Sequence, residues 1–309
     1  MTAMDDSPVV PPIVALGVAV LAISTSAILV RWSEAPNVIK ALYRVSFTVV
    51  ALLPLVRRSG GAAMRRMSHR DGLVAAAAGV ALALHFAAWF ESLDHTTVAA
   101  SVTLVQAQPV FVVAGAWLLL GERATRRAVL GIGVALLGMA GLSFGAPLLA
   151  AIDPTATAAG ADPGTQYGNA LALLAAVAVA GYYLAGRSLR RRLSVIPYVT
   201  VVYSVCALTL LVVAVAQGHA LLAYPPHEWV LFAAMALGPG VIGHTVVNWA
   251  LGHVESHVVS VSLLGEPVGS TVLAVLLLAE VPTAATVGGG VIVLAGIYIT
   301  ASASHVSEV

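Results

Sequence analysis

The chain carries one stretch of sequence twice, and this duplication limits its fold more than any other feature. Residues 109–138 and 267–296 lie 158 positions apart, and twelve of their thirty aligned pairs are identical without a gap. The identical pairs include Pro109 with Pro267, which a shared apolar composition does not explain. A constant offset of this kind indicates an internal repeat. We therefore expect two copies of one folding unit.

The composition places both copies in a lipid bilayer. Apolar residues make up 60% of the chain and charged residues 9%, with a mean hydropathy of +0.96. Soluble domains carry about 25% charged residues, so this class is excluded. The single cysteine, Cys206, can form neither an internal disulfide nor a cysteine metal site. We expect no metal, no cofactor and no nucleic-acid partner; the surroundings are the lipid bilayer.

Apolar stretches of about 20 residues predict the membrane-spanning helices. Ten such stretches occur, near 12–32, 37–56, 72–91, 96–120, 128–146, 167–186, 197–217, 228–250, 256–279 and 283–302. Each copy then holds five spans, and an odd number turns the second copy upside down relative to the first. The expected fold is an all-α integral membrane protein with ten transmembrane helices in two inverted five-helix repeats around a central cavity. We assign residues 1–150 to the first repeat, 151–166 to an external linker and 167–309 to the second.

The positions of the basic residues predict the orientation. Twelve of the fifteen Lys and Arg residues follow the second, fourth and sixth spans. The positive-inside rule makes this face cytoplasmic, so both termini are expected on the cytoplasmic side of the plasma or inner membrane. The long loop 147–166 on the opposite side has two Asp and no basic residue.

Three prolines are expected to kink or break their helices. Pro109, Pro239 and Pro267 lie inside predicted spans and lack the amide that a helix needs. Such interruptions are tolerated in a membrane where protein or a water-filled cavity satisfies the backbone. A packing kink is the alternative for each of them.

Polar side chains at similar depth are the candidate lining of the cavity, since polar groups in hydrocarbon are costly. The candidate substrate-binding residues are Arg44, His85, Trp89, Gln106, Gln108, His244, Asn248, Ser262 and Glu266, with Ser24, Thr25, Ser26 and Ser260 as further polar positions. Glu266 and His85 are the candidates for proton coupling. The alternatives are a hydroxyl bonded to its own helix and a neutral histidine bonded between helices.

Three further groups of side chains have competing interpretations. Arg44 could meet an anion, or could pair with Glu91 or Asp94, while Lys40 is close enough to the interface to extend into it. Tyr182, Tyr183 and Tyr203 are expected in the aromatic belt at the inner surface, with lining of an inner gate as the alternative. The small residues of the fifth and tenth spans suit close helix packing or a homodimer interface: Gly131, Gly138, Gly288, Gly289, Gly290 and Gly296.

Two enzyme motifs fail on their context. The residues around Ser143 spell Gly-Leu-Ser-Phe-Gly, but a nucleophile elbow needs a strand, a sharp turn and a helix. No Gly-rich Lys-Ser/Thr loop is present to hold ATP phosphates. We therefore expect no enzyme and no ATP-driven pump.

The chain resembles the drug/metabolite transporter superfamily, in particular its ten-span EamA-type members, over residues 12–302. The resemblance rests on Gln108-Pro109 and Glu266-Pro267, and on the helix ends at Gly121-Glu122 and Ala279-Glu280. The second copy departs from the family pattern at Ala279, where glycine is usual. Glu122 and Glu280 are expected to make hydrogen bonds at helix ends.

The resemblance implies a secondary active transporter that exports a small-molecule substrate. Amino acids, related metabolites or drugs are the expected cargo, moved by proton coupling or exchange with alternating access. Two other classes remain open: a membrane-embedded enzyme, and a channel or scaffold without alternating access. The sequence does not specify the cargo, the coupling ion, the direction of transport or the oligomeric state.

Overall fold

The computed structural model describes residues 11–58, 67–121, 125–152, 162–189, 195–243, 246–247 and 262–303. Within these ranges the secondary structure is helical, with no strand. The helices are α1 (Pro12–Trp32), α2 (Asn37–Arg58), α4 (His69–His95), α5 (Val98–Val105), α6 (Gln108–Leu120), α7 (Arg126–Ile152), α8 (Pro163–Leu189), α9 (Val195–Ala216), α10 (Pro226–Met235), the π-helix η1 (Ala236–Gly243), α13 (Gly265–Leu278) and α14 (Ala284–Ala303).

The helices form a multi-pass membrane protein. Seven helical stretches among the described residues are long and apolar enough to cross a bilayer: α1, α4, α5 with α6, α7, α8, α9 and α14. Helix α13 is apolar but has only 14 residues, and α2 carries four basic residues. Large apolar side chains such as Leu119, Leu137 and Leu276 are more than 70% exposed, as lipid contact requires. The count of ten spans stays a prediction.

Corresponding helices of the two copies share several of their bounds. Helices α6 and α13 end at Leu120 and Leu278, which lie 158 positions apart, and α7 and α14 begin with the same offset. The residues after α6 and α13, Gly121 and Ala279, both have a left-handed backbone with φ of 68° and 55°. The repeat seen in the sequence is therefore also a repeat in local structure.

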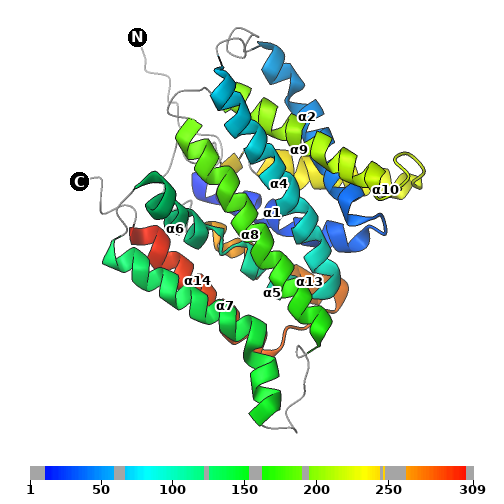
Figure 1. Ribbon diagram of the computed structural model, residues 1–309. Coiled ribbons are helices and arrows are strands. Elements are labelled where there is room, and N and C mark those ends of the chain that lie inside the picture. The colour runs from blue at the N-terminus through cyan, green and yellow to red at the C-terminus, as the bar shows by residue number, and fades with distance from the viewer. Residues whose placement is uncertain are drawn as a thin grey trace, which may run out of the picture.

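Helices α7 and α14 pack closely side by side (Figure 1). A Cβ atom on Gly131 would lie 2.5 Å from Thr300 N, and one on Gly138 would lie 2.5 Å from Val293 N. Later residues of α7 thus meet earlier residues of α14, so the two helices run antiparallel. Equivalent glycines of α14 meet α7 in the same way, Gly289 at Leu142 and Gly296 at Ala135. The expected close packing holds for these four glycines, whereas no atom approaches Gly288 and Gly290 faces Thr103 at 3.7 Å.

Further contacts join the first half of the chain to the second, beside others within each half. Helix α1 packs against α13, and its equivalent α8 packs against α6. Helix α4 packs against α8 and α9, next to α2. This crossed packing brings α1, α2, α4, α5 and α13 together in the interior.

The predicted linker is shorter than expected from the sequence. Helix α7 continues to Ile152 and α8 begins at Pro163, so both helices extend into the range predicted as a loop. The rest of that loop lies outside the described residues.

Candidate functional site

The candidate site is built around a helix break in each repeat. Helix α5 ends at Val105, the backbone turns through Gln106 and Ala107, and α6 begins at Gln108. In the second repeat a turn at Leu264 precedes α13. Pro109 and Pro267 lie in the first turn of the following helix, where a missing amide breaks no helical hydrogen bond. Each proline therefore lies in the first turn of a new helix that follows a break. Backbone polar groups at the break are left without helical partners.

Pro239 has a different effect from the one expected. The backbone does not break at this proline but widens into the π-helix η1. In an α-helix the carbonyl of Met235 would pair with the amide of residue 239, which a proline lacks. A π-helix pairs each carbonyl with the amide five residues on, so the carbonyl of Met235 can pair with the amide of Gly240. The sequence alone gave no sign of this change of register.

A hydrogen bond connects the two helix breaks. Gln106 Nε2 donates to Glu266 Oε2, and Gln108 Nε2 donates to Gln106 Oε1 at 3.2 Å. All three side chains are half-buried. The structure thus brings together three of the predicted site residues, from both copies of the repeat.

Arg44 lies near this chain of polar groups, on α2. Its side chain is 6% exposed, and Nη1 donates to the Ser26 hydroxyl on α1. The guanidinium carbon lies 4.8 Å from the ring centroid of Phe86 and 5.7 Å from that of Trp89, within the range of cation–π attraction. Its charge attracts that of Glu266, although the two form no ion pair in the described part of the chain.

The alternative that Arg44 pairs with Glu91 or Asp94 finds no support in these contacts. Asn37 Nδ2 donates to both carboxylates, at 2.8 and 2.7 Å. Tyr203 lies within electrostatic reach of Arg44, and Tyr183 within that of Glu266. Their place in the aromatic belt stays a prediction.

His85 lies between two helices. Its Nδ1 is 2.9 Å from the carbonyl oxygen of Ala175 on α8, and its ring stacks on Trp89 at a centroid distance of 5.9 Å. This is the arrangement of an interhelical histidine, the alternative left open for it. Trp89 itself is 5% exposed, and its Nε1 has no hydrogen-bond partner among the described residues.

The predicted hydroxyl positions divide between local and interhelical bonds. Thr25 Oγ1 donates to Ala22 O on its own helix, while Ser24 Oγ donates to Val20 O and, at 3.3 Å, to Glu266 O. Ser262 lies just before the break at Leu264. The candidates His244, Asn248 and Ser260 and the helix-end residue Glu122 lie outside the described residues.

A second polar cluster closes the end of the helix bundle where α1 ends and α2 begins. Arg31 donates to Leu93 O on α4 and forms an ion pair with Glu280 at 3.3 Å, after α13. Glu280 also accepts from Val98 N at 2.7 Å, the first amide of α5. A carboxylate satisfies such an unpaired amide and is favoured by the helix dipole.

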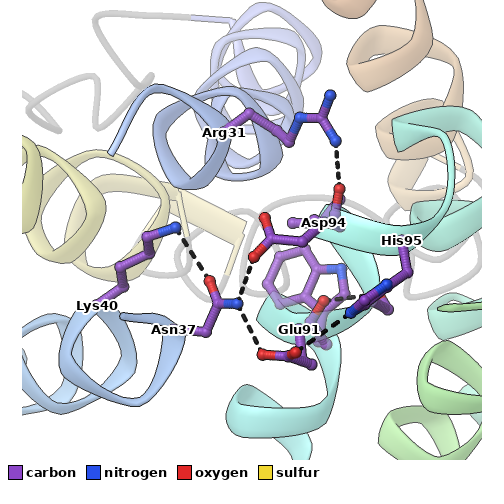
Figure 2. Close-up of polar contacts among 9 residues, drawn as sticks. Arg31, Asn37, Lys40, Glu91, Asp94 and His95 are labelled. Atoms are coloured by element: carbon purple, nitrogen blue, oxygen red, sulfur yellow. Dashed lines mark hydrogen bonds and ion pairs between the residues drawn. The ribbon is translucent and has the colours of Figure 1, made fainter. Parts of the chain in front are cut away.

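Figure 2 shows how this cluster holds three helices of the first repeat together. Asn37 links α2 to Glu91 and Asp94 of α4, and Lys40 Nζ donates to Asn37 Oδ1 at 3.0 Å. We call this cluster the Arg31 cluster; it comprises Arg31, Asn37, Lys40, Glu91, Asp94 and Glu280. The hydrogen bond at a helix end was predicted for Glu280 from the sequence, but the cluster as a whole was not, although polar residues at the ends of apolar spans were the available signal.

Comparison with known proteins identifies the family. The model of the EamA-like transporter family matches the chain twice, over residues 11–144 and 166–302. The chain belongs to this family. Members of the EamA-like transporter family are membrane transporters of the drug/metabolite type, and the family is not one of enzymes.

One solved structure supports the same fold. A crystal structure described only as that of a protein has 22% sequence identity and a TM-score of 0.58, covering 94% of this chain and 96% of its own. At that identity the likeness concerns the fold alone. A comparison with curated proteins finds no match.

Proposed function

We propose that this EamA-like protein is a secondary active transporter that exports small metabolites, such as amino acids and related compounds, or drugs by alternating access. Glu266 is its coupling residue and the Gln106–Glu266 pair lies in its cargo site. The hydrogen bond between Gln106 and Glu266 carries the proposal, because it joins the helix breaks of both repeats. Transporter sites form at such interrupted helices between repeats.

The packing of the repeats supports the proposed inverted arrangement. Helices α7 and α14 are equivalent in sequence, and their glycine contacts run antiparallel and are reciprocal. Reciprocal contacts between equivalent elements are those that a twofold axis generates. An axis in the membrane plane would expose the cargo site first to one side and then to the other.

Alternating access also requires closures that open reversibly. The Arg31 cluster lies at the end predicted to be external, and only its ion pair between Arg31 and Glu280 joins the two repeats through partly exposed side chains. The Arg31 and Glu280 side chains are 30% and 18% exposed. Exposed ion pairs contribute only about 0.2–1 kcal/mol, so this closure is weak enough to open.

The proposed coupling follows from the surroundings of Glu266. As a carboxylate, Glu266 accepts a hydrogen bond from Gln106 and is attracted by the positive charge of Arg44. A proton on Glu266 removes the attraction to Arg44 and weakens the bond from Gln106. Protonation thereby changes the relative stability of two arrangements of α2, α5 and α13, which a coupled carrier requires.

Glu266→Gln tests the proposal in proteoliposomes. The variant keeps the shape of the side chain but cannot bind and release a proton. Flux driven by a pH gradient should fall by about tenfold or more, since hydrogen bonds to charged groups contribute about 1.5–3 kcal/mol. Counterflow of labelled cargo without a gradient should persist.

Asp162 is an exposed carboxylate before α8, and Asp162→Asn is the matched control. This variant should retain coupled flux. Coupled flux by Glu266→Gln at the wild-type rate would remove Glu266 from the mechanism. Wild-type flux that never saturates and shows no counterflow would indicate a channel instead.

A further inference from the structure

Two buried donor groups lie side by side on α2 and α4 without an acceptor to match them. Arg44 has five N–H donors, and the described residues give it one neutral acceptor, the Ser26 hydroxyl. Trp89 Nε1 has none. The side chains are 6% and 5% exposed, and the guanidinium carbon is 5.7 Å from the Trp89 ring centroid.

Buried donors without partners are costly, particularly when one carries a charge. Nearby groups relieve this cost only in part, because none of the described ones except Ser26 accepts a hydrogen bond from the guanidinium. Glu266 attracts Arg44 but lies outside ion-pair distance, and Phe86 and Phe90 offer ring faces, with the guanidinium carbon 4.8 and 5.8 Å from their centroids. The arrangement is therefore matched to an anionic group that arrives from outside the chain.

We propose that Arg44, Trp89 and Ser26 bind the carboxylate of the cargo. This inference rests on the proposed transport function and names the chemical class of its substrate. A carboxylate can receive two parallel N–H donors from a guanidinium, and the indole N–H adds a third. The surrounding aromatic rings keep water away, which strengthens each of these bonds.

The rest of the site determines what else the cargo carries. Glu266 lies in the electrostatic field of Arg44 but not in contact with it, so the carboxylate and an ammonium group of one small molecule can meet the two charges separately. Phe86 is only partly buried and covers the guanidinium.

The test uses matched sets of three probes. Each set holds an amino acid, its carboxamide, and the carboxylic acid that lacks the amino group. Thermal stabilisation of the purified protein measures binding, since a ligand of the folded state raises the melting temperature. At least one amino acid or plain acid should bind about tenfold or more tightly than its carboxamide.

Two variants assign the effect to these residues. Trp89→Phe keeps the ring and removes the N–H, and should weaken binding of the acid about tenfold with little effect on the carboxamide. Arg44→Lys keeps the charge but loses the paired donors, and should weaken the acid at least as much. Trp117→Phe, at a side chain 56% exposed, is the matched control and should bind as the wild type does.

The outcomes separate the proposal from the function on which it rests. Equal binding of acid and carboxamide, or acid binding by both variants at wild-type strength, overturns the carboxylate site and leaves the transporter in place. Tighter binding of the amino acid than of the acid without an amino group would support an ammonium contact at Glu266. Equal binding of these two probes would limit the site to the carboxylate. Failure of the wild type to show counterflow with any small molecule counts against the proposed function itself.

Discussion

At the scale of single residues, Ala279 is the clearest local compromise in the structure. It is the one non-glycine residue with positive φ in the described part of the chain, at 55°, and its equivalent in the first repeat is Gly121. The left-handed region costs an L-residue about 1–2 kcal/mol. The departure from glycine seen in the sequence therefore has a physical consequence.

Ala279→Gly should stabilise the protein by up to about 1 kcal/mol, because glycine adopts this backbone without strain. Gly121→Ala should destabilise it by a similar amount for the opposite reason. The melting temperatures of the two variants in one detergent measure both effects. A lower melting temperature for Ala279→Gly would contradict this account of the helix end.

At the scale of helices, the Arg31 cluster joins α1 to the turn after α13. Arg31→Gln should loosen this end, so that a cysteine placed at Ala99, which is 7% exposed on α5, reacts faster with a thiol reagent. An increase of about two- to fivefold is expected for an ion pair of this exposure. Glu280→Gln should act similarly, and the double variant should gain less than the product of the two single effects.

Asp162→Asn is the control for this experiment. Asp162 is exposed, and its Oδ2 accepts a hydrogen bond from Thr165 N at 3.2 Å at the start of α8, so its replacement leaves the contacts among α1, α4 and the end of α13 unchanged. If the two effects multiply, Arg31 and Glu280 act independently and the closure lies elsewhere.

The glycine contacts of α7 and α14 support a second prediction at this scale. Gly138→Ala places a methyl group 2.5 Å from the backbone nitrogen of Val293, which cannot move aside, and should destabilise the fold by about 1–3 kcal/mol. A Cβ atom on Gly133 would meet no other residue of the described part of the chain within 4 Å, so Gly133→Ala should be neutral or stabilising by up to about 1 kcal/mol. Melting temperatures that fall equally for both variants would argue against the assigned interface.

The same helices show which features the sequence could predict. Hydropathy predicted the seven described helical stretches that are long enough to cross a bilayer, and proline positions predicted the breaks near Pro109 and Pro267, because these signals are local. The Gln106–Glu266 bond and the Arg31–Glu280 pair join residues more than 150 positions apart, which periodicity does not relate. At Pro239 the sequence predicted only an interruption, because a proline shows which carbonyl loses its amide and not how the backbone pairs that carbonyl again.

At the scale of the whole molecule, orientation in the membrane connects the Arg31 cluster to export. The two ends of the molecule differ in charge, and the positive-inside rule assigns the Arg-rich end to the cytoplasm. With this orientation α7 would end and α8 would begin outside, and the Arg31 cluster would form the proposed external closure. If the orientation were reversed, the same contacts would close the cytoplasmic end, and the proposed order of steps in transport would reverse with them.

Cysteine labelling decides between the two orientations. Thr165→Cys, near the start of α8, should react with a membrane-impermeant thiol reagent in intact cells, whereas Ser68→Cys, at the start of α4, should react only after lysis. Thr165 lies in the first turn of α8, and Ser68 is the N-cap residue of α4. Because α4 crosses the membrane once, Ser68 and the Arg31 cluster lie at its opposite ends. The native Cys206 is fully buried and gives the background in each case. Labelling of Ser68→Cys from outside, with Thr165→Cys protected, would invert the topology and make the Arg31 cluster the inner closure.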